Sequence, residues 1–395
     1  MLKHNIRILI FCCLLIMTAQ FGMSLYLPSF LMIKKVLILS SPAIQKTLSF
    51  FVLGYASLML LWGSFAEYFG RKKTLIAIII FFIISSLLIT ATRNIILFYI
   101  LRIVQGAASG GLAVTSRILI RDHFKGKMLT KNMIILSIAF ATAFPLSQIS
   151  GAFINMFYSW RVDFWFLALL GILALILTIL WDFEEREKIA KKSKERKKYF
   201  QVLSEYNRIL SNKNFLSIVT VGSIGYIISV LYQTVSPIYL METLKLSVKE
   251  YSITSILNTI SYLLGILTLH QVIDRYPSKI LIRISVISLF FLGFLLFFSA
   301  FSSSSLYFVS LMASITFCTA ALYPLNLTLA LESFPLSGPQ ATAAFGFLQQ
   351  VLASIFSFLV AGAIHNVFML AIMLILFGYI GLKLSNKMIH SSEII

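Results

Sequence analysis

The sequence has 395 residues, of which 59% are hydrophobic and 12% are charged, and its formal net charge is +19. Soluble domains average roughly 45–50% apolar and about 25% charged residues, so this composition excludes a soluble enzyme, a disordered chain and a coiled coil. A positive charge of this size suggests nucleic-acid binding, but 35 Phe and few charged residues leave no soluble basic face. We therefore expect a polytopic membrane protein with the lipid bilayer, and no nucleic acid, as a partner.

Apolar stretches long enough to cross a bilayer, about 20 residues each, recur along the chain. They lie near residues 6–33, 46–66, 74–92, 95–119, 131–158, 163–182, 213–240, 251–272, 280–300, 304–331, 340–364 and 366–384. The runs are continuous and do not alternate with polar residues, which disfavours a β-barrel. The first run resembles a secretory signal because Lys3 and Arg7 precede it, but it continues past Pro28 to Ile33 and is longer than a signal's apolar core. The sequence predicts an all-α fold of twelve transmembrane helices.

Lys and Arg are distributed unequally between the two sides of these spans. If both termini are cytoplasmic, 25 of the 33 basic residues lie on the inner side, as the positive-inside rule requires. A polar segment, residues 183–212, carries Glu184, Glu185 and a basic run; it is either a solvated linker or a surface for anionic lipids. It predicts two six-helix halves, residues 1–182 and 213–395, joined by a cytoplasmic linker.

Parts of the two halves repeat each other. The stretch from Gly63 to Lys73, GSFAEYFGRKK, follows span two, and HQVIDRYPSK, from His270 to Lys279, follows span eight. Arg121-Asp122 after span four similarly corresponds to Leu331-Glu332 after span ten. Such repeats are typical of transporters, whose substrate site lies between them. The residues expected to form a cytoplasmic gate are Gly63, Glu67, Gly70, Arg71, Lys72, Asp122, Asp274 and Glu332; the alternative is a topological anchor with incidental acids.

The stretch from Gly63 to Lys73 resembles the loop 2–3 signature of the major facilitator superfamily, G-x-x-x-D-R-x-G-R-K, with Glu67 at the acid. Arg102-Ile-Val-Gln105-Gly106 is similar to the fourth-span R-x-x-Q-G motif of the same superfamily. Other segments resemble its Bcr/CflA group of drug-resistance efflux proteins: Leu25-Tyr26-Leu27-Pro28-Ser29, Ile120-Arg121-Asp122, Ser159-Trp160-Arg161 with Phe164-Trp165, and Glu332-Ser-Phe334-Pro335. This resemblance implies alternating access between the halves and efflux of small organic molecules by proton antiport, and we expect a monomer.

Two features depart from that group. The acid that its members commonly carry in span one is replaced by Ser24, and the fifth-span antiporter motif is degenerate between Phe144 and Gly151. All 14 acids lie in loops or close to the ends of the predicted spans, whereas Arg102 lies within one. Because a charge inside a span is costly, Arg102 is the clear functional candidate, as a contact for an anionic substrate or a neighbour of a proton carrier; the alternative is a packing role. The pair His270 and Asp274 is either a titrating site or a topological edge.

Polar side chains within the spans are candidates for the lining of a central cavity. Amides in spans either line a water-filled path or join helices by hydrogen bonds. The predicted substrate and coupling residues are Arg102, Gln105, Tyr26, Ser24, Gln20, Tyr232, Gln233, Asn258, Tyr323, Asn326 and Gln349, with Tyr262 and Gln350 nearby. Pro28, Pro145, Pro237 and Pro324 are expected to mark helix kinks.

No catalytic motif is present. The sequence contains no H-E-x-x-H, G-x-S-x-G or phosphate-loop pattern, and its three cysteines lack metal-ligand spacing. We therefore expect neither an enzyme nor a cofactor or metal. Three functions remain: drug or metabolite efflux coupled to protons, transport of one anionic metabolite or metallophore without the usual proton coupling, or a membrane sensor that transports nothing.

Overall fold

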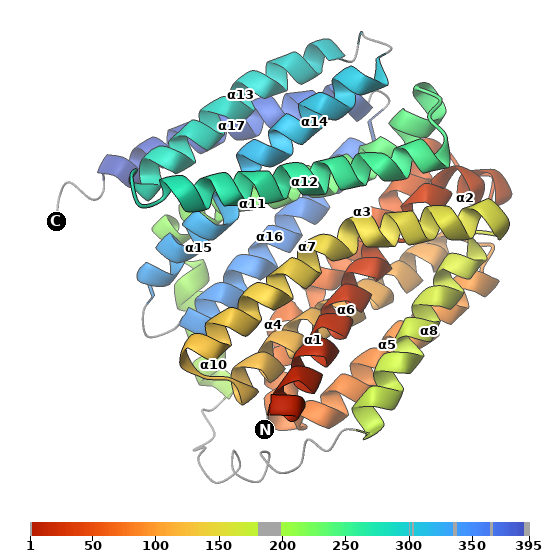
Figure 1. Ribbon diagram of the computed structural model, residues 1–395, viewed down its shortest axis with the longest axis horizontal. Coiled ribbons are helices and arrows are strands. Elements are labelled where there is room, and N and C mark those ends of the chain that lie inside the picture. Colours follow the sequence, from red (N-terminus) through yellow and green to blue (C-terminus); the bar gives the residue numbers. More distant parts are fainter. Residues whose placement is uncertain are drawn as a thin grey trace. The chain divides into compact units, whose positions relative to one another are not determined.

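The computed structural model describes residues 2–180, 199–299, 301, 304–334, 338–363 and 366–390. The side chains of residues 2–5, 67, 127, 130, 199–203, 338, 339, 366 and 386–390 are outside this description. In the part that it covers, every regular element is a helix (Figure 1). The all-α fold predicted from the continuous apolar runs is confirmed.

The first half of the chain forms α1 (Leu2–Ser24), η1 (Leu27–Ser29), α2 (Phe30–Val36), α3 (Ser41–Ser57), α4 (Met59–Tyr68), α5 (Arg71–Ala91), α6 (Ile95–His123), α7 (Gly126–Phe157) and α8 (Arg161–Leu180). The second half forms α10 (Tyr199–Leu210), α11 (Lys213–Ile238), η2 (Tyr239–Thr243), α12 (Val248–Val272), α13 (Ser278–Ser299), α14 (Ser305–Thr319), α15 (Leu322–Glu332), α16 (Gly338–Ala361) and α17 (Asn366–His390).

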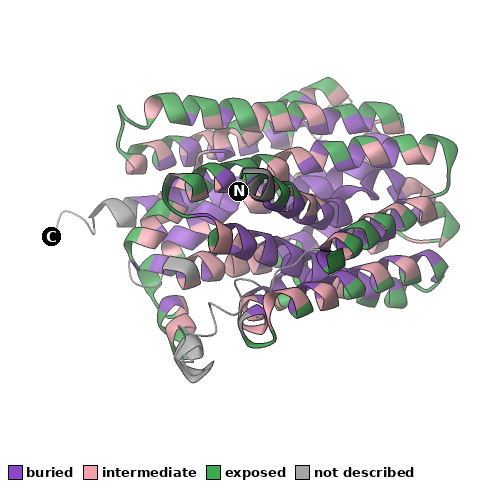
Figure 2. Cartoon of the chain, turned by 60° about the horizontal axis from the view of Figure 1, so that its bottom comes forward, coloured by how far each residue is buried: buried purple, intermediate pink, exposed green. Residues whose placement is uncertain are grey.

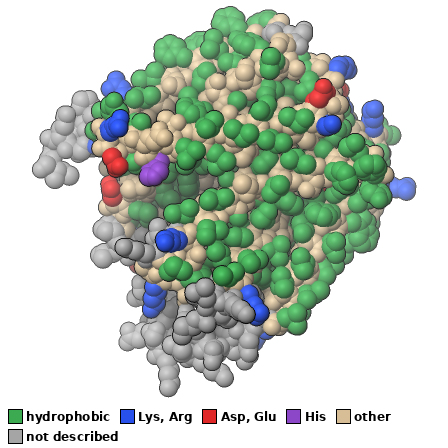
Figure 3. Space-filling model, viewed as in Figure 1, with side chains coloured by type: hydrophobic (Ala, Val, Ile, Leu, Met, Phe, Trp, Pro, Cys, Tyr) green, Lys and Arg blue, Asp and Glu red, His purple; other side chains and the backbone are tan. Residues whose placement is uncertain are grey.

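Among the described residues, 12 segments are long and apolar enough to cross a membrane. Each overlaps one of the twelve spans expected from the sequence. The spans differ in how much of them is buried by the rest of the protein. In an apolar stretch of 18 residues, 72% is buried in Ile6–Val36 and in Lys213–Thr243, against 33% in Lys131–Phe157. Spans one and seven are thus the best-enclosed helices of their units. Figure 2 shows the helices with one buried and one exposed side, and on the face in Figure 3 the exposed side chains are mostly hydrophobic, as lipid contact requires.

The chain divides into two compact units, residues 1–197 and 198–395. The predicted linker, residues 183–212, contains the helix α10 at its end. Its acidic and basic run, up to residue 198, lies outside the described residues.

Three of the four prolines singled out in the sequence accompany a change of helix type or a break. Pro28 lies in the 3-10 turn η1 that interrupts span one, Pro237 precedes the π-helical η2, and Pro324 follows the break between α14 and α15. Proline lacks the donor that a regular helix needs, so these irregular turns are expected there. Pro145, in contrast, lies inside α7, which continues through it.

Glycines set the spacing between α3 and α6 in the first unit. A Cβ on Gly106 would overlap the carbonyl oxygen of Phe51, and one on Gly54 would overlap that of Ile103. The two helices therefore touch backbone to backbone, as small residues permit in membrane proteins. This close approach brings Arg102, one turn before Gly106, against α3.

Candidate functional site

Arg102 is fully buried in the first unit, with 0% of its surface exposed. Its guanidinium carbon lies 4.2 Å from the centre of the Tyr26 ring and 4.3 Å from that of Phe51. Nη1 donates to the carbonyl oxygen of Gly22 at 2.8 Å and to Oε1 of Gln105 at 2.5 Å. Two aromatic faces and these acceptors stabilise the cation away from water. Nη2 is buried and has no partner among the described residues.

Gln105 and Tyr26 extend the contacts of Arg102 to neighbouring spans. Gln105 Nε2 donates to Ser86 Oγ on α5 at 2.8 Å, and the Tyr26 hydroxyl lies 2.8 Å from Thr47 Oγ1 on α3. Spans one, two, three and four therefore meet at one polar centre. The structure brings together Arg102, Gln105 and Tyr26, which the sequence nominated separately.

Ser24 joins span one to span five. Its hydroxyl lies 2.5 Å from Ser147 Oγ on α7 and donates to the Gln20 carbonyl at 3.0 Å. Nearby, a Cβ on Gly151 would overlap the Leu25 carbonyl oxygen, so α7 packs closely on span one. The segment between Phe144 and Gly151, degenerate as an antiporter motif, thus forms a tight contact with span one. Gln20 is also buried, with 8% of its surface exposed.

The second unit holds neutral candidate residues, and the Tyr232 and Asn258 side chains lie within reach of each other. The Tyr232 hydroxyl lies 3.0 Å from Thr254 Oγ1, and Gln233 Nε2 donates to the Ser229 carbonyl. Asn258 accepts from Thr316 at 3.5 Å, and Asn326 donates to the Leu322 carbonyl at 2.8 Å within its own helix. These four side chains are buried. Their contacts join helices of this unit or stay within one helix, and none of them contains a charge.

The other candidate residues of this unit, unlike those four, differ in exposure. Gln349 and Gln350 are buried, whereas Tyr323 is 36% exposed and packs against the Phe345 ring. Gln350 accepts from the hydroxyl of Tyr226 at 3.0 Å. These candidate residues thus make neutral hydrogen bonds and aromatic packing contacts.

Two residues of the predicted gate motif, Arg71 and Asp122, form an ion pair in the first unit. Nε of Arg71 donates to Oδ2 of Asp122 at 3.1 Å, joining the start of α5 to the end of α6. Gly70 precedes Arg71 with φ 94°, a backbone conformation that favours glycine. Lys72 donates to the Ile179 carbonyl on α8 at 3.1 Å.

The remaining gate residues make fewer contacts. A Cβ on Gly63 would meet nothing within 4 Å, so this glycine is not required by packing. The side chain of Glu67 is outside the described residues. In the second unit, Asp274 and Glu332 are exposed.

Asp163 is the functional candidate that sequence reasoning missed. Its position in the first turn of α8 fits the expected place near a span end, but its side chain is 0% exposed. It is the only fully buried acid in the part of the chain described, so Arg102 is not the lone buried charge, which corrects the expectation. The Asp163 carboxylate accepts from Ser29 Oγ and from Asn155 Nδ2. Its only sequence signal is its place within the Trp160–Trp165 aromatic segment.

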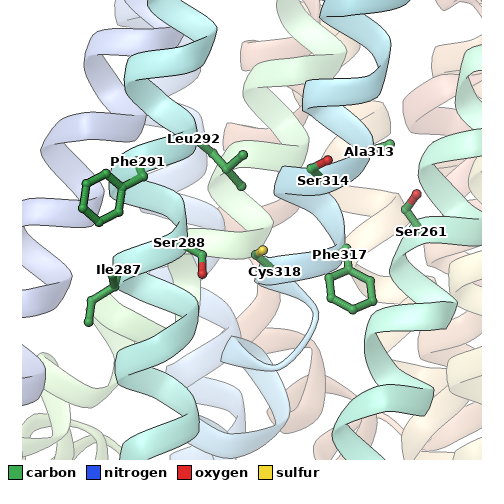
Figure 4. Close-up of a pocket in the computed structure, with 9 residues that line it drawn as sticks. All are labelled: Ser261, Ile287, Ser288, Phe291, Leu292, Ala313, Ser314, Phe317 and Cys318. Atoms are coloured by element: carbon green, nitrogen blue, oxygen red, sulfur yellow. The ribbon is translucent and has the colours of Figure 1, made fainter.

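A hollow of about 610 Å³ opens on the second unit between α12, α13 and α14 (Figure 4). Its lining is largely apolar, with three serine hydroxyls and one thiol: Ser261, Ile287, Ser288, Phe291, Leu292, Ala313, Ser314, Phe317 and Cys318. Phe291 is 62% exposed. None of the predicted site residues lines it, and nothing in its lining selects a polar ligand.

Twelve apolar spans in two units, with buried polar contacts between helices, define a polytopic helical membrane protein. The sequence profile of the Major Facilitator Superfamily matches residues 12–357, and the chain belongs to this superfamily. Transporters of this family are not enzymes, so the expected absence of enzymatic activity is confirmed by family membership.

Solved structures support the same fold. The xylose transporter XylE from E. coli, in a partially occluded inward-open conformation, superposes with a TM-score of 0.70 at 17% identity, covering 98% of this chain and 97% of that one. The nucleoside transporter NupG superposes with a TM-score of 0.72 at 13% identity, covering 98% and 99%. At these identities the likeness concerns the fold alone.

Curated relatives include drug-resistance proteins. The chain is 33% identical over 176 residues to the bicyclomycin resistance protein homolog of Haemophilus influenzae, covering 44% of each protein. It is 25% identical over 254 residues to the chloramphenicol resistance protein CraA of Acinetobacter baumannii, covering 64% of this chain and 60% of that one. These matches confirm the resemblance to the Bcr/CflA group and span less than two thirds of either relative.

Proposed function

We propose that this transporter exports small organic molecules, drugs among them, from a bacterial cytoplasm by proton antiport with alternating access of its two units. The observation that carries this proposal is the buried centre of Arg102, Gln105 and Tyr26, which joins four spans of a chain similar to drug-resistance proteins. A buried ionisable group inside a membrane span is a functional-site candidate by default.

The proposal includes an orientation. Both termini and residues 183–212 lie in the cytoplasm, because that arrangement places 25 of the 33 Lys and Arg residues inside. Arg71 and Asp122 are then on the cytoplasmic side and serve as a latch that opens during the cycle. The protein acts as a monomer in the inner membrane.

A second candidate is export or import of one anionic metabolite or metallophore. The observation in its favour is Nη2 of Arg102, a buried guanidinium donor without a partner, because an anion would satisfy it. Against a direct anion contact, the guanidinium of Arg102 is fully buried and packs against the rings of Tyr26 and Phe51. Export of drugs explains the relatives better, so it is the main proposal.

Deletion of the gene, with complementation by the wild type and by Arg102→Ala, tests both candidates. Drug export predicts sensitivity to several unrelated compounds, including chloramphenicol, that the wild-type gene restores and Arg102→Ala does not. Unchanged tolerance together with the loss of one secreted product contradicts drug export and supports the metabolite. No change in any solute flux contradicts both and favours a sensor. Transport by reconstituted protein that is identical with and without a pH gradient contradicts antiport.

A further inference from the structure

Asp163 lies in a cluster built from three elements of the first unit. Ser29 comes from η1 in the interrupted span one, Asn155 from the last turns of α7, and Asp163 from the first turn of α8. Asn155 Nδ2 donates to Ser29 Oγ at 2.5 Å, to Asp163 Oδ2 at 3.3 Å and to the Gly151 carbonyl at 2.7 Å. Ser29 Oγ also donates to Asp163 Oδ2. Both donors therefore converge on one carboxylate oxygen.

The other carboxylate oxygen is unused. Asp163 Oδ1 is buried and has no hydrogen-bond partner among the described residues, and the same is true of Asn155 Oδ1. Buried acceptors are nearly always satisfied, so two orphans in one cluster need an explanation. A proton on Asp163 Oδ1 gives one, because it turns a bare charged acceptor into a neutral hydroxyl donor.

No cation balances this carboxylate. Arg161 lies two residues away, but its Nε donates to the Thr90 carbonyl at 2.9 Å and its guanidinium packs over Trp160 at 4.5 Å. No Lys, Arg or His among the described residues forms an ion pair with Asp163, whereas Arg71 pairs with Asp122. An ionised carboxylate enclosed in a span without a counter-charge is costly.

The ionisable groups on the helices around Asp163 either bond to other residues or lie far along the helix from it. On span one, the Tyr26 hydroxyl bonds Thr47, and Arg7 lies more than five helical turns before Ser29. After Ser29 on the same span, Lys34 donates to Ser41 Oγ at 2.8 Å and Lys35 is exposed. On α7, Tyr158 is 62% exposed and Lys131 is near the opposite end. The cations of α5, which are Arg71, Lys72 and Lys73, occupy its first turn, whereas Thr90 at its last turn meets Arg161. On α6, Arg102 is held by Gly22 and Gln105, and the Tyr99 hydroxyl donates to the Ala43 carbonyl.

We propose that Asp163, held by Ser29 and Asn155, is the proton-binding site of the transport cycle, in place of the acid that is absent at Ser24. This inference rests on the proposed antiport. A proton delivered by water forms an O–H bond at Oδ1 and neutralises the carboxylate; its return to water breaks that bond and restores the charge. In the first transfer an O–H bond of a hydronium ion breaks as the carboxyl O–H bond forms, and in the second that hydronium bond forms again, so each step balances.

The geometry couples this proton to helix movement. Hydrogen bonds to an ionised carboxylate are roughly twice as strong as neutral ones, so the charged form holds η1, α7 and α8 together and the protonated form loosens them. Ser29 is in the 3-10 turn, three residues after Tyr26, whose ring covers Arg102. Tyr26 also packs on Phe164, the neighbour of Asp163, at 5.6 Å between ring centres. Protonation of Asp163 thus acts on the segment that covers Arg102.

Purified full-length protein in liposomes tests this assignment, with chloramphenicol as the probe. The wild type is expected to accumulate the probe under a pH gradient, and Asp163→Asn to lose this accumulation while still exchanging the probe at equal pH. Asp163→Glu keeps a carboxyl group and is expected to retain part of the gradient-driven accumulation. The control Glu250→Gln alters an exposed helix-cap acid and is expected to leave the accumulation unchanged. Infrared difference spectra between low and high pH are expected to contain a protonated-carboxyl component in the wild type that is missing from Asp163→Asn, on top of the contribution of the acids that the two proteins share.

The outcomes separate this inference from the proposed function. Gradient-driven accumulation that survives in Asp163→Asn, or an infrared carboxyl difference spectrum that is the same in this variant as in the wild type, overturns the role of Asp163 and leaves antiport standing. Wild-type transport that is the same with and without a pH gradient, or that follows a sodium gradient, overturns antiport and the proton site together. If Asp163→Asn does not fold, Ser29→Ala replaces it, with accumulation expected to fall and the infrared band to shift.

Discussion

The hydroxyl of Tyr26 lies 2.8 Å from Oγ1 of Thr47, joining span one to span two. The second unit repeats this relationship, because the Tyr232 hydroxyl lies 3.0 Å from Thr254 Oγ1 and joins span seven to span eight. A second hydroxyl pair repeats as well: Ser24 with Ser147 in the first unit, and Thr234 with Ser357 in the second. The two units thus share these two inter-span contacts. They differ at the tyrosine ring, because a cation, Arg102, packs on Tyr26, whereas Phe308 stacks on Tyr232.

Removing the hydroxyl of either tyrosine is expected to have a small effect on stability. Hydrogen bonds between membrane helices contribute about 0.6 kcal/mol on average, so Tyr26→Phe and Tyr232→Phe lower the melting temperature in detergent slightly and to a similar extent. Tyr26→Phe keeps the ring over Arg102 and retains transport. The exposed Tyr158→Phe is the control. A large loss of stability in one variant alone contradicts the equivalence of the two contacts.

Much of the fold could be predicted from the sequence. Span number and helix class follow from continuous apolar runs, because the bilayer imposes both length and internal hydrogen bonding on each segment. Arg102 could be found for the same reason, since a charge within an apolar run stands out. Asp163 could not, because burial near a span end depends on how η1 and α7 cover it, which is tertiary information. The contact between Tyr26 and Arg102 likewise joins spans one and four, and neither segment's sequence predicts that these two spans pack together.

Replacing Arg102 by lysine is expected to abolish most transport although the charge is kept. A lysine ammonium is a compact charge that cannot fill the planar space between Tyr26 and Phe51 or donate in the same fork geometry. Drug tolerance of a complemented deletion strain and substrate flux in liposomes measure the effect. Arg93→Lys, at an exposed position, serves as the matched control. Wild-type flux in Arg102→Lys would show that only the charge matters.

The ion pair of Arg71 and Asp122 is expected to affect transport more than stability. Its side chains are 17% and 34% exposed, and exposed ion pairs contribute between about 0 and 1 kcal/mol. Asp122→Asn therefore changes the melting temperature little, whereas a latch that closes one side of the transporter loses closure and the transport rate falls. A double-mutant cycle with Arg71→Gln measures the coupling in both assays. Additive effects on the transport rate contradict a latch formed by this pair.

Gly106→Ala is expected to destabilise the first unit and to reduce transport. The added Cβ meets the backbone carbonyl of Phe51, which cannot turn aside as a side chain does, so α3 and α6 must separate. That separation withdraws Phe51 and Thr47 from Arg102 and leaves a buried guanidinium with poorer partners. Gly63→Ala is the matched control, because its Cβ meets nothing within 4 Å. Melting temperature and flux are compared for both variants; equal behaviour of the two would contradict the close contact of α3 and α6 as the support of Arg102.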